Sequence, residues 1–268
     1  MSDGLFTNVS RQAHPCTSEI PGERDFFTDL MSIMSLPVQL PLSVQLRDDA
    51  TFANYFSGQN ATLVNLLNTN QQAPGMEPEQ FIYLYGASGV GCSHLLQAAC
   101  HQVDSQNGRS IYLPMKELVQ YPPHMLEGME RLQLVCLDDI GAVAGIPEWE
   151  EALFDLFNRL RDAKTRFLVA ADNPPKALNL ELPDLESRLG WGMVFQVQPL
   201  NDKDKVAALQ LRAHLRGLDM SEEVARFIIY RSTRDMGYLF RILQKLDSAS
   251  LRAKRKLTIP FVKEVMVW

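Results

Sequence analysis

The sequence predicts an α/β protein in which a five-stranded parallel sheet is flanked by helices and followed by a small all-helical domain. Three observations predict this fold. Five short apolar segments recur between residues 81 and 198, and amphipathic stretches lie between them. This alternation is typical of a parallel sheet that helices cover on both faces. After Pro199 the strand-like segments stop, and the periodicity becomes helical.

The predicted strands are short apolar runs, as expected of strands buried on both faces. Among the helices between them, residues 148–163 read EWEEALFDLFNRLRDA. Leu153, Phe154, Phe157 and Leu160 form one apolar stripe opposite charged positions, so we expect this helix to pack on the sheet. The predicted strands are residues 81–85 (FIYLY), 110–115 (SIYLPM), 132–139 (LQLVCLDD), 166–172 (RFLVAAD) and 194–198 (VFQVQ).

The chain divides into three parts. Residues 1–47 mix Pro, Ser, Thr and charged residues with little periodicity, so we expect a mostly disordered tail. Residues 48–199 hold the predicted strands and form the expected α/β core. Residues 200–268 form the expected helical domain, in which Asn201 and Ser221 are candidate N-caps.

The composition argues against several classes of protein, among them nucleic-acid-wrapping, disulfide-bonded, zinc-binding and membrane-spanning proteins. The net charge of −6 argues against a protein that wraps nucleic acid directly, so we expect any contact with DNA to be indirect. The cysteines have no C-x-x-C spacing, which predicts reduced thiols and neither a disulfide nor a zinc site. No apolar run is long enough for a membrane span, and no signal-peptide pattern is present, so we expect a cytoplasmic protein. The four cysteines are Cys16, Cys92, Cys100 and Cys136.

A glycine-rich loop, YGASGVGCSH at residues 85–94, follows the first predicted strand. Gly86, Gly91 and Ser93 fit the phosphate-binding pattern G-x-x-x-x-G-K-[ST], but Cys92 stands where the lysine belongs. The backbone N–H groups of this loop can still bind an anion at the start of a helix. We therefore expect a site that binds a nucleoside diphosphate better than it hydrolyses a triphosphate. The candidate nucleotide-binding residues of the loop are Gly86, Gly89, Val90, Gly91, Cys92, Ser93 and His94.

Two other interpretations of the loop remain open. It could be a glycine turn that only joins a strand to a helix. Alternatively, Cys92 could be a redox thiol, because a helix N-terminus lowers the pKa of a thiol. A nucleophilic role would need a base, and His94 is the only nearby candidate.

The strand segment LVCLDD resembles a Walker B strand. Asp138 is placed to bind magnesium together with Ser93, and Asp139 stands where a water-polarising carboxylate would lie. Taken alone, two carboxylates at the end of a strand could be loop-facing charges. The upstream glycine loop favours the metal-binding interpretation, so Mg²⁺ is a candidate ion.

These features occur in the order found in the DnaA/Hda family of bacterial AAA+ proteins, which the chain resembles over residues 37–268. The segment DDATFANYFSGQNATLVNLL (48–67) resembles the stretch that precedes the family's phosphate loop. RFLVAADNPP resembles sensor 1, PDLESRLGWG the arginine-finger box, STRDMGYLFRIL sensor 2, and KLTIPFVKEV the last helix of the lid. The resemblance implies an AAA+ P-loop core with a helical lid.

The resemblance also implies roles for individual residues. Phe52 and Phe56 would lie near the base, Asp172 would be sensor 1, and Arg234 would be sensor 2. Arg188 would be a catalytic arginine finger supplied to a partner's nucleotide. The alternatives are a surface pair of Arg188 with Glu186, and an exposed helix position for Arg234. The basic run 252–256 is expected to be a solvated helix end.

The segment QLPLSV in the tail is similar to peptides that bind the bacterial sliding clamp, which is the beta subunit of DNA polymerase III. Gln39, Leu40, Leu42 and Val44 would be the anchoring residues, although leucine or phenylalanine is commoner than valine at the last position. The alternative is a linker that contacts nothing.

The resemblance and the motifs together predict a negative regulator of replication initiation. Its cofactor would be ADP, its partners would be the initiator DnaA and the DNA-loaded sliding clamp, and it would promote hydrolysis of DnaA-bound ATP through Arg188 rather than hydrolyse ATP itself. One alternative is a self-sufficient AAA+ ATPase or loader that binds DNA directly. Another is a scaffold in which the nucleotide is only a structural plug. A homodimer is compatible with the sequence, which does not fix the oligomeric state.

Overall fold

A computed structural model describes residues 46–268 except residue 48 and residues 69–77. The described residues belong to one compact unit, residues 41–268. The predicted clamp-binding residues Gln39, Leu40, Leu42 and Val44 lie outside the described residues, as does Cys16. The structure therefore bears on the core and the helical domain.

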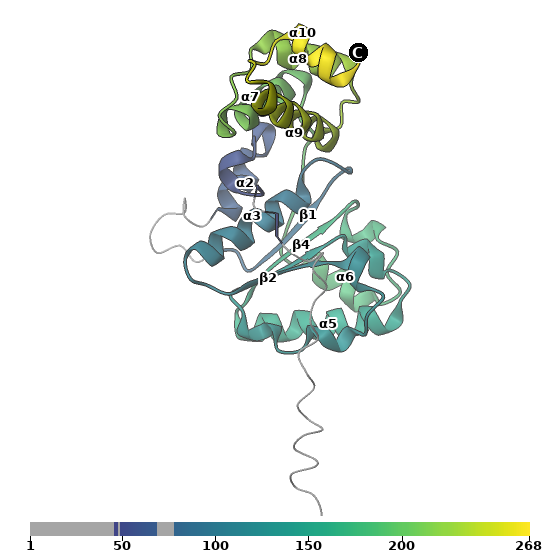
Figure 1. Cartoon of the computed structure of the whole chain (residues 1–268). Helices are drawn as coiled ribbons and strands as arrows, with labels where there is room; N and C mark the ends of the chain where they lie inside the picture. Colours follow the sequence, from purple (N-terminus) through teal and green to yellow (C-terminus); the bar gives the residue numbers. More distant parts are fainter. Residues whose placement is uncertain (1–45, 48, 69–77) are drawn as a thin grey trace, which may run out of the picture. The chain divides into compact units, whose positions relative to one another are not determined.

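The core contains a five-stranded parallel sheet, as predicted (Figure 1). The strands lie in the order β2-β3-β4-β1-β5, so β1 lies between β4 and β5. All five predicted strand segments are strands. The second is shorter than predicted, because Met115 begins a helix, and the third and fourth are also shorter. The fifth begins and ends earlier than predicted. The strands are β1 (Phe81–Tyr85), β2 (Ser110–Pro114), β3 (Leu134–Asp138), β4 (Arg166–Ala171) and β5 (Met193–Gln196).

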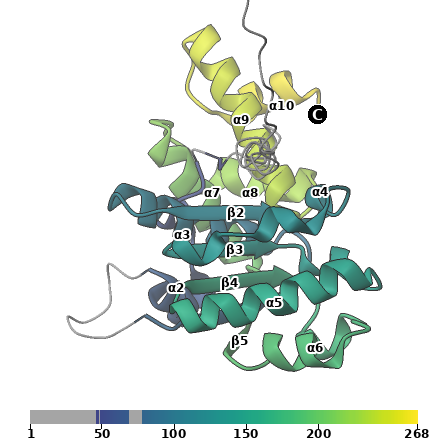
Figure 2. The same ribbon diagram turned by 90° about the horizontal axis from the view of Figure 1, so that it is seen from below.

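Helices cover both faces of this sheet, as Figures 1 and 2 show. Ile82 and Leu84 of β1 point to the face that α2 and α3 cover, where they join their apolar core. Phe81 points to the other face and stacks on Phe157 of α5, with ring centroids 4.4 Å apart. The core helices are α2 (Ala61–Leu67), α3 (Cys92–Ser105), α4 (Met115–Leu118), α5 (Pro147–Ala163) and α6 (Pro183–Leu189), and short 3₁₀ turns lie at Phe52–Asn54, Gly58–Asn60, Pro123–Leu126, Met129–Arg131, Ile140–Val143 and Pro175–Ala177.

The buried residues of α5 include three of the four positions of the predicted stripe. Leu153, Phe157 and Leu160 are buried as predicted, and Leu156 is buried with them. Phe154 is only half-buried, and the centre of the Arg188 guanidinium is 6.0 Å from the centroid of its ring.

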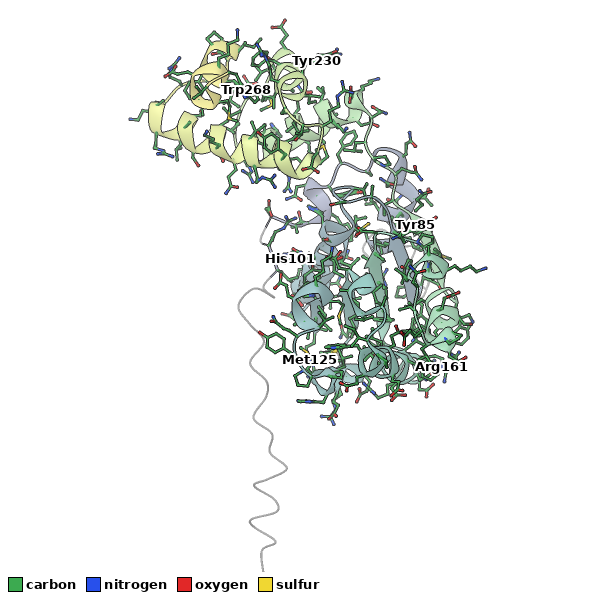
Figure 3. The ribbon with its side chains drawn as sticks, turned by 90° about the vertical axis from the view of Figure 1, so that its right-hand side faces the viewer. Tyr85, His101, Met125, Arg161, Tyr230 and Trp268 are labelled. Carbon is green, nitrogen blue, oxygen red and sulfur yellow. The ribbon has the colours of Figure 1, made fainter. Side chains whose placement is uncertain are left out.

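The C-terminal residues form the predicted helical lid. Its helices are α7 (Asp202–Leu215), α8 (Glu222–Arg231), α9 (Met236–Ala253) and α10 (Ile259–Met266). Asn201 and Ser221 are N-caps as predicted, since their side chains accept hydrogen bonds from Asp204 N and Val224 N. The lid has its own apolar core, against which Trp268 packs (Figure 3).

The basic run 252–256 is exposed around the end of α9, as predicted. Cys92, Cys100 and Cys136 are free thiols. In the described part of the chain, no helix is both long enough and apolar enough to cross a membrane.

Two buried polar side chains fix the segment before the glycine loop. The Asn60 amide donates to Gln198 O at 2.9 Å and accepts from Gln198 N at 2.8 Å. Arg166, at the start of β4, donates to the carbonyl oxygens of Leu66 and Leu67 at the end of α2. These bonds satisfy backbone groups that would otherwise be buried without partners, and they hold the segment against the sheet.

A buried carboxylate ties two loops of the core together. Glu150 of α5 is only 1% exposed, and its oxygens accept hydrogen bonds from Gly145 N at 2.9 Å, Glu181 N at 3.2 Å and Leu182 N at 2.7 Å. Leu182 is the residue before α6, so this carboxylate holds the start of the helix that carries Arg188.

We predict that Glu150→Gln lowers the free energy of unfolding by about 2 kcal/mol, because the amide NH₂ would face backbone donors and leave one of them unpaired. The measurement is urea denaturation followed by circular dichroism. Glu151→Gln is the matched control, since Glu151 is exposed on the same helix. Equal stability of the two variants would contradict this account of Glu150.

Candidate functional site

The glycine loop joins β1 to α3, and its backbone needs glycine at three positions. Gly89 and Gly91 have φ angles of +84° and +106°, a region that residues with side chains rarely adopt. A Cβ atom on Gly91 would lie 2.8 Å from the Tyr55 ring, and one on Gly86 would lie 2.8 Å from Val197 O. The loop is therefore packed closely between the segment before it and the residue after β5.

The loop places the N-terminus of α3 at the wall of a surface hollow. Gly91 is the N-cap of α3, so the N–H groups of Cys92, Ser93 and His94 lie in its first turn, where an α-helix offers them no backbone acceptor. These donors and the helix dipole favour an anion at this place. The close-packed glycine backbone and the helix N-terminus thus fit the phosphates of a nucleotide.

The Cys92 side chain brings no charge to this position. Burial, followed by the charges of Asp138 and Asp172, raises the pKa of the Cys92 thiol to about 12, so the thiol is protonated at neutral pH. His94 is buried, and its Nε2 lies 2.9 Å from Thr51 O. Burial lowers the His94 pKa to about 4, which leaves the ring neutral. Both features argue against the redox-thiol interpretation.

The end of β3 brings Asp138 to the loop. Tyr112 Oη donates to Asp138 Oδ2 at 2.5 Å, Asp139 N donates to Oδ1 at 3.0 Å, and the Ser93 side chain also hydrogen-bonds this carboxylate. Burial raises the Asp138 pKa, while the bonds from Ser93 and Tyr112 oppose that shift. Ser93 and Asp138, the candidate magnesium ligands, are therefore adjacent. Within the described residues, no cluster of three or more His, Cys, Asp and Glu side chains could hold a metal ion.

Asp139 is held by a residue that the sequence motifs do not include. The Lys116 ammonium lies 2.7 Å from Asp139 Oδ1. Asp139 has a φ of +54°, so the chain turns sharply after β3. This turn places the second carboxylate of the LVCLDD segment beside α4.

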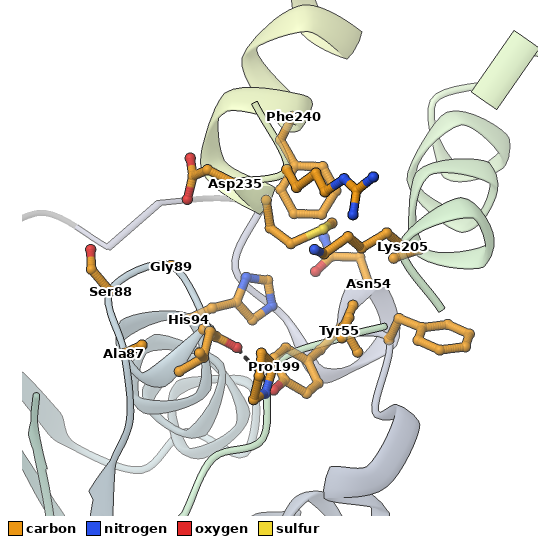
Figure 4. A pocket seen from close by; sticks show the side chains of 17 residues that line it. Asn54, Tyr55, Ala87, Ser88, Gly89, His94, Pro199, Lys205, Asp235 and Phe240 are labelled. Atoms are coloured by element: carbon orange, nitrogen blue, oxygen red, sulfur yellow. Dashed lines mark hydrogen bonds between the residues drawn. The ribbon is translucent and has the colours of Figure 1, made fainter. Parts of the chain in front are cut away.

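Two adjoining hollows surround the loop, and both contain residues 87–91, His94, Met236 and Phe240. We call the first the base-side hollow (Figure 4). We call the second the phosphate-side hollow. The base-side hollow is also lined by Asn54, Tyr55, Phe56, Pro199, Leu200, Lys205, Ala208, Arg234 and Asp235. The phosphate-side hollow is also lined by Arg47, Gly86, Cys92, Ser93, Lys116, Asp138, Asp139, Ala171, Asp172, Arg212 and Gly237.

Most of the predicted nucleotide-binding residues line these hollows; Phe52 lines neither, and Arg234 lines only the base-side hollow. Phe52 packs into the apolar core beneath the loop and lines neither hollow. Arg234 lies in the base-side hollow rather than the phosphate-side hollow, and its Nη1 is 3.2 Å from Asp202 Oδ2. Asp172 follows β4 and lines the phosphate-side hollow.

Sequence reasoning missed several lining residues. Asn54 and Tyr55 lie between the two predicted phenylalanines, and aromatic enrichment in TFANYF was the only signal for them. The lid residues Met236 and Phe240 belong to the segment that resembles sensor 2, but only Arg234 of that segment was predicted to bind the nucleotide. Lys116 likewise appeared as an ordinary charged residue in the sequence.

Arg188 lies on α6, outside both hollows. Its guanidinium lies over the Trp191 ring, 5.0 Å from the centroid, and 6.0 Å from the Phe157 centroid. Trp191 is 57% exposed. Arg188 does not form the ion pair with Glu186 that was the alternative to a finger. It is half-buried and lies over the exposed Trp191 ring and the buried Phe157 ring.

Comparisons with known proteins agree with this architecture. Residues 46–196, more than half of the chain, match the family described as "Bacterial DnaA ATPAse domain", and residues 202–266 match "Hda, lid domain". Domain III of the Thermotoga maritima replication initiation protein DnaA is 20% identical with a TM-score of 0.69, covering 82% of this chain and 97% of that one.

Two further DnaA structures are similar in fold. AMPPCP-bound DnaA from Aquifex aeolicus is 21% identical with a TM-score of 0.62, covering 78% of this chain and 69% of that chain. A DnaA bound to AMPPCP and single-stranded DNA is 22% identical with a TM-score of 0.62, with the same coverage of 78% and 69%. The fold, the lid and the two family matches lead to one conclusion: this chain belongs to the DnaA/Hda family of AAA+ proteins of bacterial replication initiation.

Proposed function

We propose that this protein is a negative regulator of replication initiation that stimulates hydrolysis of ATP bound to the initiator DnaA. In this proposal the protein holds ADP, is recruited by the DNA-loaded sliding clamp, and supplies Arg188 to the initiator's nucleotide. It acts in the cytoplasm and reaches DNA only through the clamp.

The observation that carries this proposal is the location of Arg188. Arg188 lines neither hollow of its own nucleotide site, and its guanidinium lies on an exposed indole. We infer from this position that the guanidinium serves the phosphates of a neighbouring molecule rather than those of its own nucleotide site. An arginine supplied in trans stabilises the charge that develops during phosphoryl transfer.

The nucleotide site supports binding without efficient hydrolysis. Two of the similar DnaA structures hold AMPPCP, and the phosphate-loop geometry of this chain fits the phosphates of a nucleotide. The loop lacks the lysine that would contact the outer phosphates, and the Cys92 thiol in its place is neutral. We infer that the resident nucleotide is a diphosphate, with ADP as the candidate and Mg²⁺ as its candidate ion.

In this proposal the residues of the site bind the phosphates, the Mg²⁺ ion and the base of the nucleotide. The loop N–H groups and Ser93 would hold the diphosphate, and Ser93 together with Asp138 would hold Mg²⁺. Tyr55, Phe56, Met236 and Phe240 form the apolar walls where a base would lie. When bound, the nucleotide would join the core to the lid, because residues of both parts line the hollows.

The rival function is a self-sufficient ATPase or loader that binds DNA directly. The missing loop lysine argues against efficient turnover, and the net charge of −6 argues against a large DNA-binding surface. Steady ATP hydrolysis by the purified chain without partners would favour this rival.

We predict that Arg188→Ala reduces the stimulated ATPase rate of DnaA by about 10³-fold or more, because the guanidinium that stabilises the transition state is lost. The measurement is hydrolysis of DnaA-bound ATP with the sliding clamp loaded on DNA.

The matched control for Arg188 is Arg161→Ala. Arg161 also lies over Trp191, 5.9 Å from its centroid, but it belongs to the end of α5. The control should stimulate hydrolysis nearly as well as the unaltered protein. Full stimulation by Arg188→Ala would rule out the proposed mechanism.

We predict that Cys92→Lys raises the affinity for ATP by about tenfold, because an ammonium is restored beside the outer phosphates. The charges of Asp138 and Asp172 act on this position and would favour a cation there. Isothermal titration calorimetry measures the change, and Cys92→Ser, which adds no charge, is the control. If Cys92→Lys does not raise the affinity for ATP, the loop backbone and not the missing charge sets the preference for a diphosphate.

We predict that deletion of residues 39–44 abolishes binding to the sliding clamp, because the glutamine and aliphatic anchors are lost. Surface plasmon resonance on immobilised clamp measures the binding, and deletion of residues 20–25 is the control of equal length. Unchanged clamp affinity after the first deletion would remove the tail from the proposal.

A further inference from the structure

The phosphate-side hollow contains three cationic side chains that the phosphate-loop motif does not include: Arg47, Lys116 and Arg212. Arg212 is partly engaged, although its Nε is buried without a hydrogen-bond partner. Its side chain is 5% exposed, its Nη1 donates to Asp49 O at 2.8 Å, and its guanidinium stacks on Phe240 at 4.6 Å. Arg47 is exposed, with its Nε 3.9 Å from Asp49 Oδ1.

Lys116 differs from both arginines because it lies at the carboxylate edge of the hollow. The register of β2 and β3 pairs Pro114 with Asp138, so the residues that follow each strand emerge side by side. Lys116 Nζ is 2.7 Å from Asp139 Oδ1, and the Lys116 side chain is 61% exposed. An ammonium has three N–H donors, so the Asp139 contact leaves donors available to a ligand.

The charges around the hollow favour a cation at this place. Asp138, Asp139 and Asp172 line it, and the protonated Cys92 thiol offers no compensation. A nucleoside diphosphate would add more negative charge at the same place. The hydrogen bond that Lys116 donates to Asp139 raises the pKa of Lys116, so its ammonium stays charged at neutral pH.

We propose that Lys116 replaces the missing loop lysine as the cation that contacts the terminal phosphate of the bound nucleotide. In this proposal the cation belongs to the start of α4 instead of the loop. Asp139 holds the Lys116 ammonium at the edge of the hollow, and it competes with the phosphate for that ammonium. This inference rests on the nucleotide binding in the proposed function, but it concerns a residue and a contact that the proposal does not use.

The test measures the affinity of nucleotide-free, full-length protein for AMP and ADP by isothermal titration calorimetry. Lys116→Gln should weaken ADP binding by about tenfold, because a charge-assisted contact is lost. The loss should be much smaller for AMP, which lacks the β-phosphate. Lys116→Arg should restore most of the ADP affinity, since it keeps the charge.

Asp139→Asn separates a phosphate contact from a merely structural ion pair. If Lys116 contacts the nucleotide, Asp139→Asn should strengthen ADP binding by about threefold to tenfold, because a competing negative charge is removed. If the pair only supports the fold, both variants break it and should change ADP affinity in the same direction. That second result would overturn the inference.

Lys245→Gln is the matched control, because Lys245 is exposed on α9 of the lid and lines neither hollow. It removes the same net charge and should leave ADP affinity unchanged. An equal loss in Lys116→Gln and Lys245→Gln would also overturn the inference, leaving the proposed function intact. Failure of the unaltered protein to bind ADP at all would instead overturn both the inference and the ADP-bound state in the proposed function.

Discussion

The structure depends on the parallel alignment of β1, β3 and β4, whose carboxyl ends meet at one edge of the sheet. The register pairs Tyr85 with Ala171 and Leu137 with Val169, so the residues after each strand emerge side by side. A slip of one residue would turn every side chain of a strand to the opposite face. The glycine loop, the Asp138 carboxylate and Asp172 share a hollow only because this register is kept.

Two effects shift the pKa of the Cys92 thiol in opposite directions, and the larger of the two decides whether the thiol is charged. A helix N-terminus typically stabilises a negative charge by about 0.3–1 kcal/mol, which is less than one pKa unit. Burial and the carboxylates of Asp138 and Asp172 instead raise the pKa from 9.0 to about 12. The thiol is therefore neutral although it begins a helix, and the loop lacks both a cation and a reactive sulfur.

Much of the fold could be predicted from the sequence, because strands buried on both faces and N-caps such as Asn201 leave local patterns. The glycine loop and Asp138 could be predicted for the same reason. Lys116 could not, since its contact with Asp139 arises only from the register between β2 and β3. Phe240 belongs to the hollows only because the lid docks on the core, and Phe52 turns into the core instead of lining them.

The surroundings of Arg188 explain how a guanidinium can be held in place and still be available. A partner carboxylate would occupy its N–H donors and would have to be displaced before a phosphate could bind. Aromatic rings hold the cation through their faces with about 0.5–1 kcal/mol at exposed sites, and they leave the donors in the guanidinium plane unused. Trp191 and Phe157 provide such a support, and Glu150 fixes the start of the helix that carries Arg188. The contacts that orient Arg188 therefore do not compete with the phosphate it is proposed to meet.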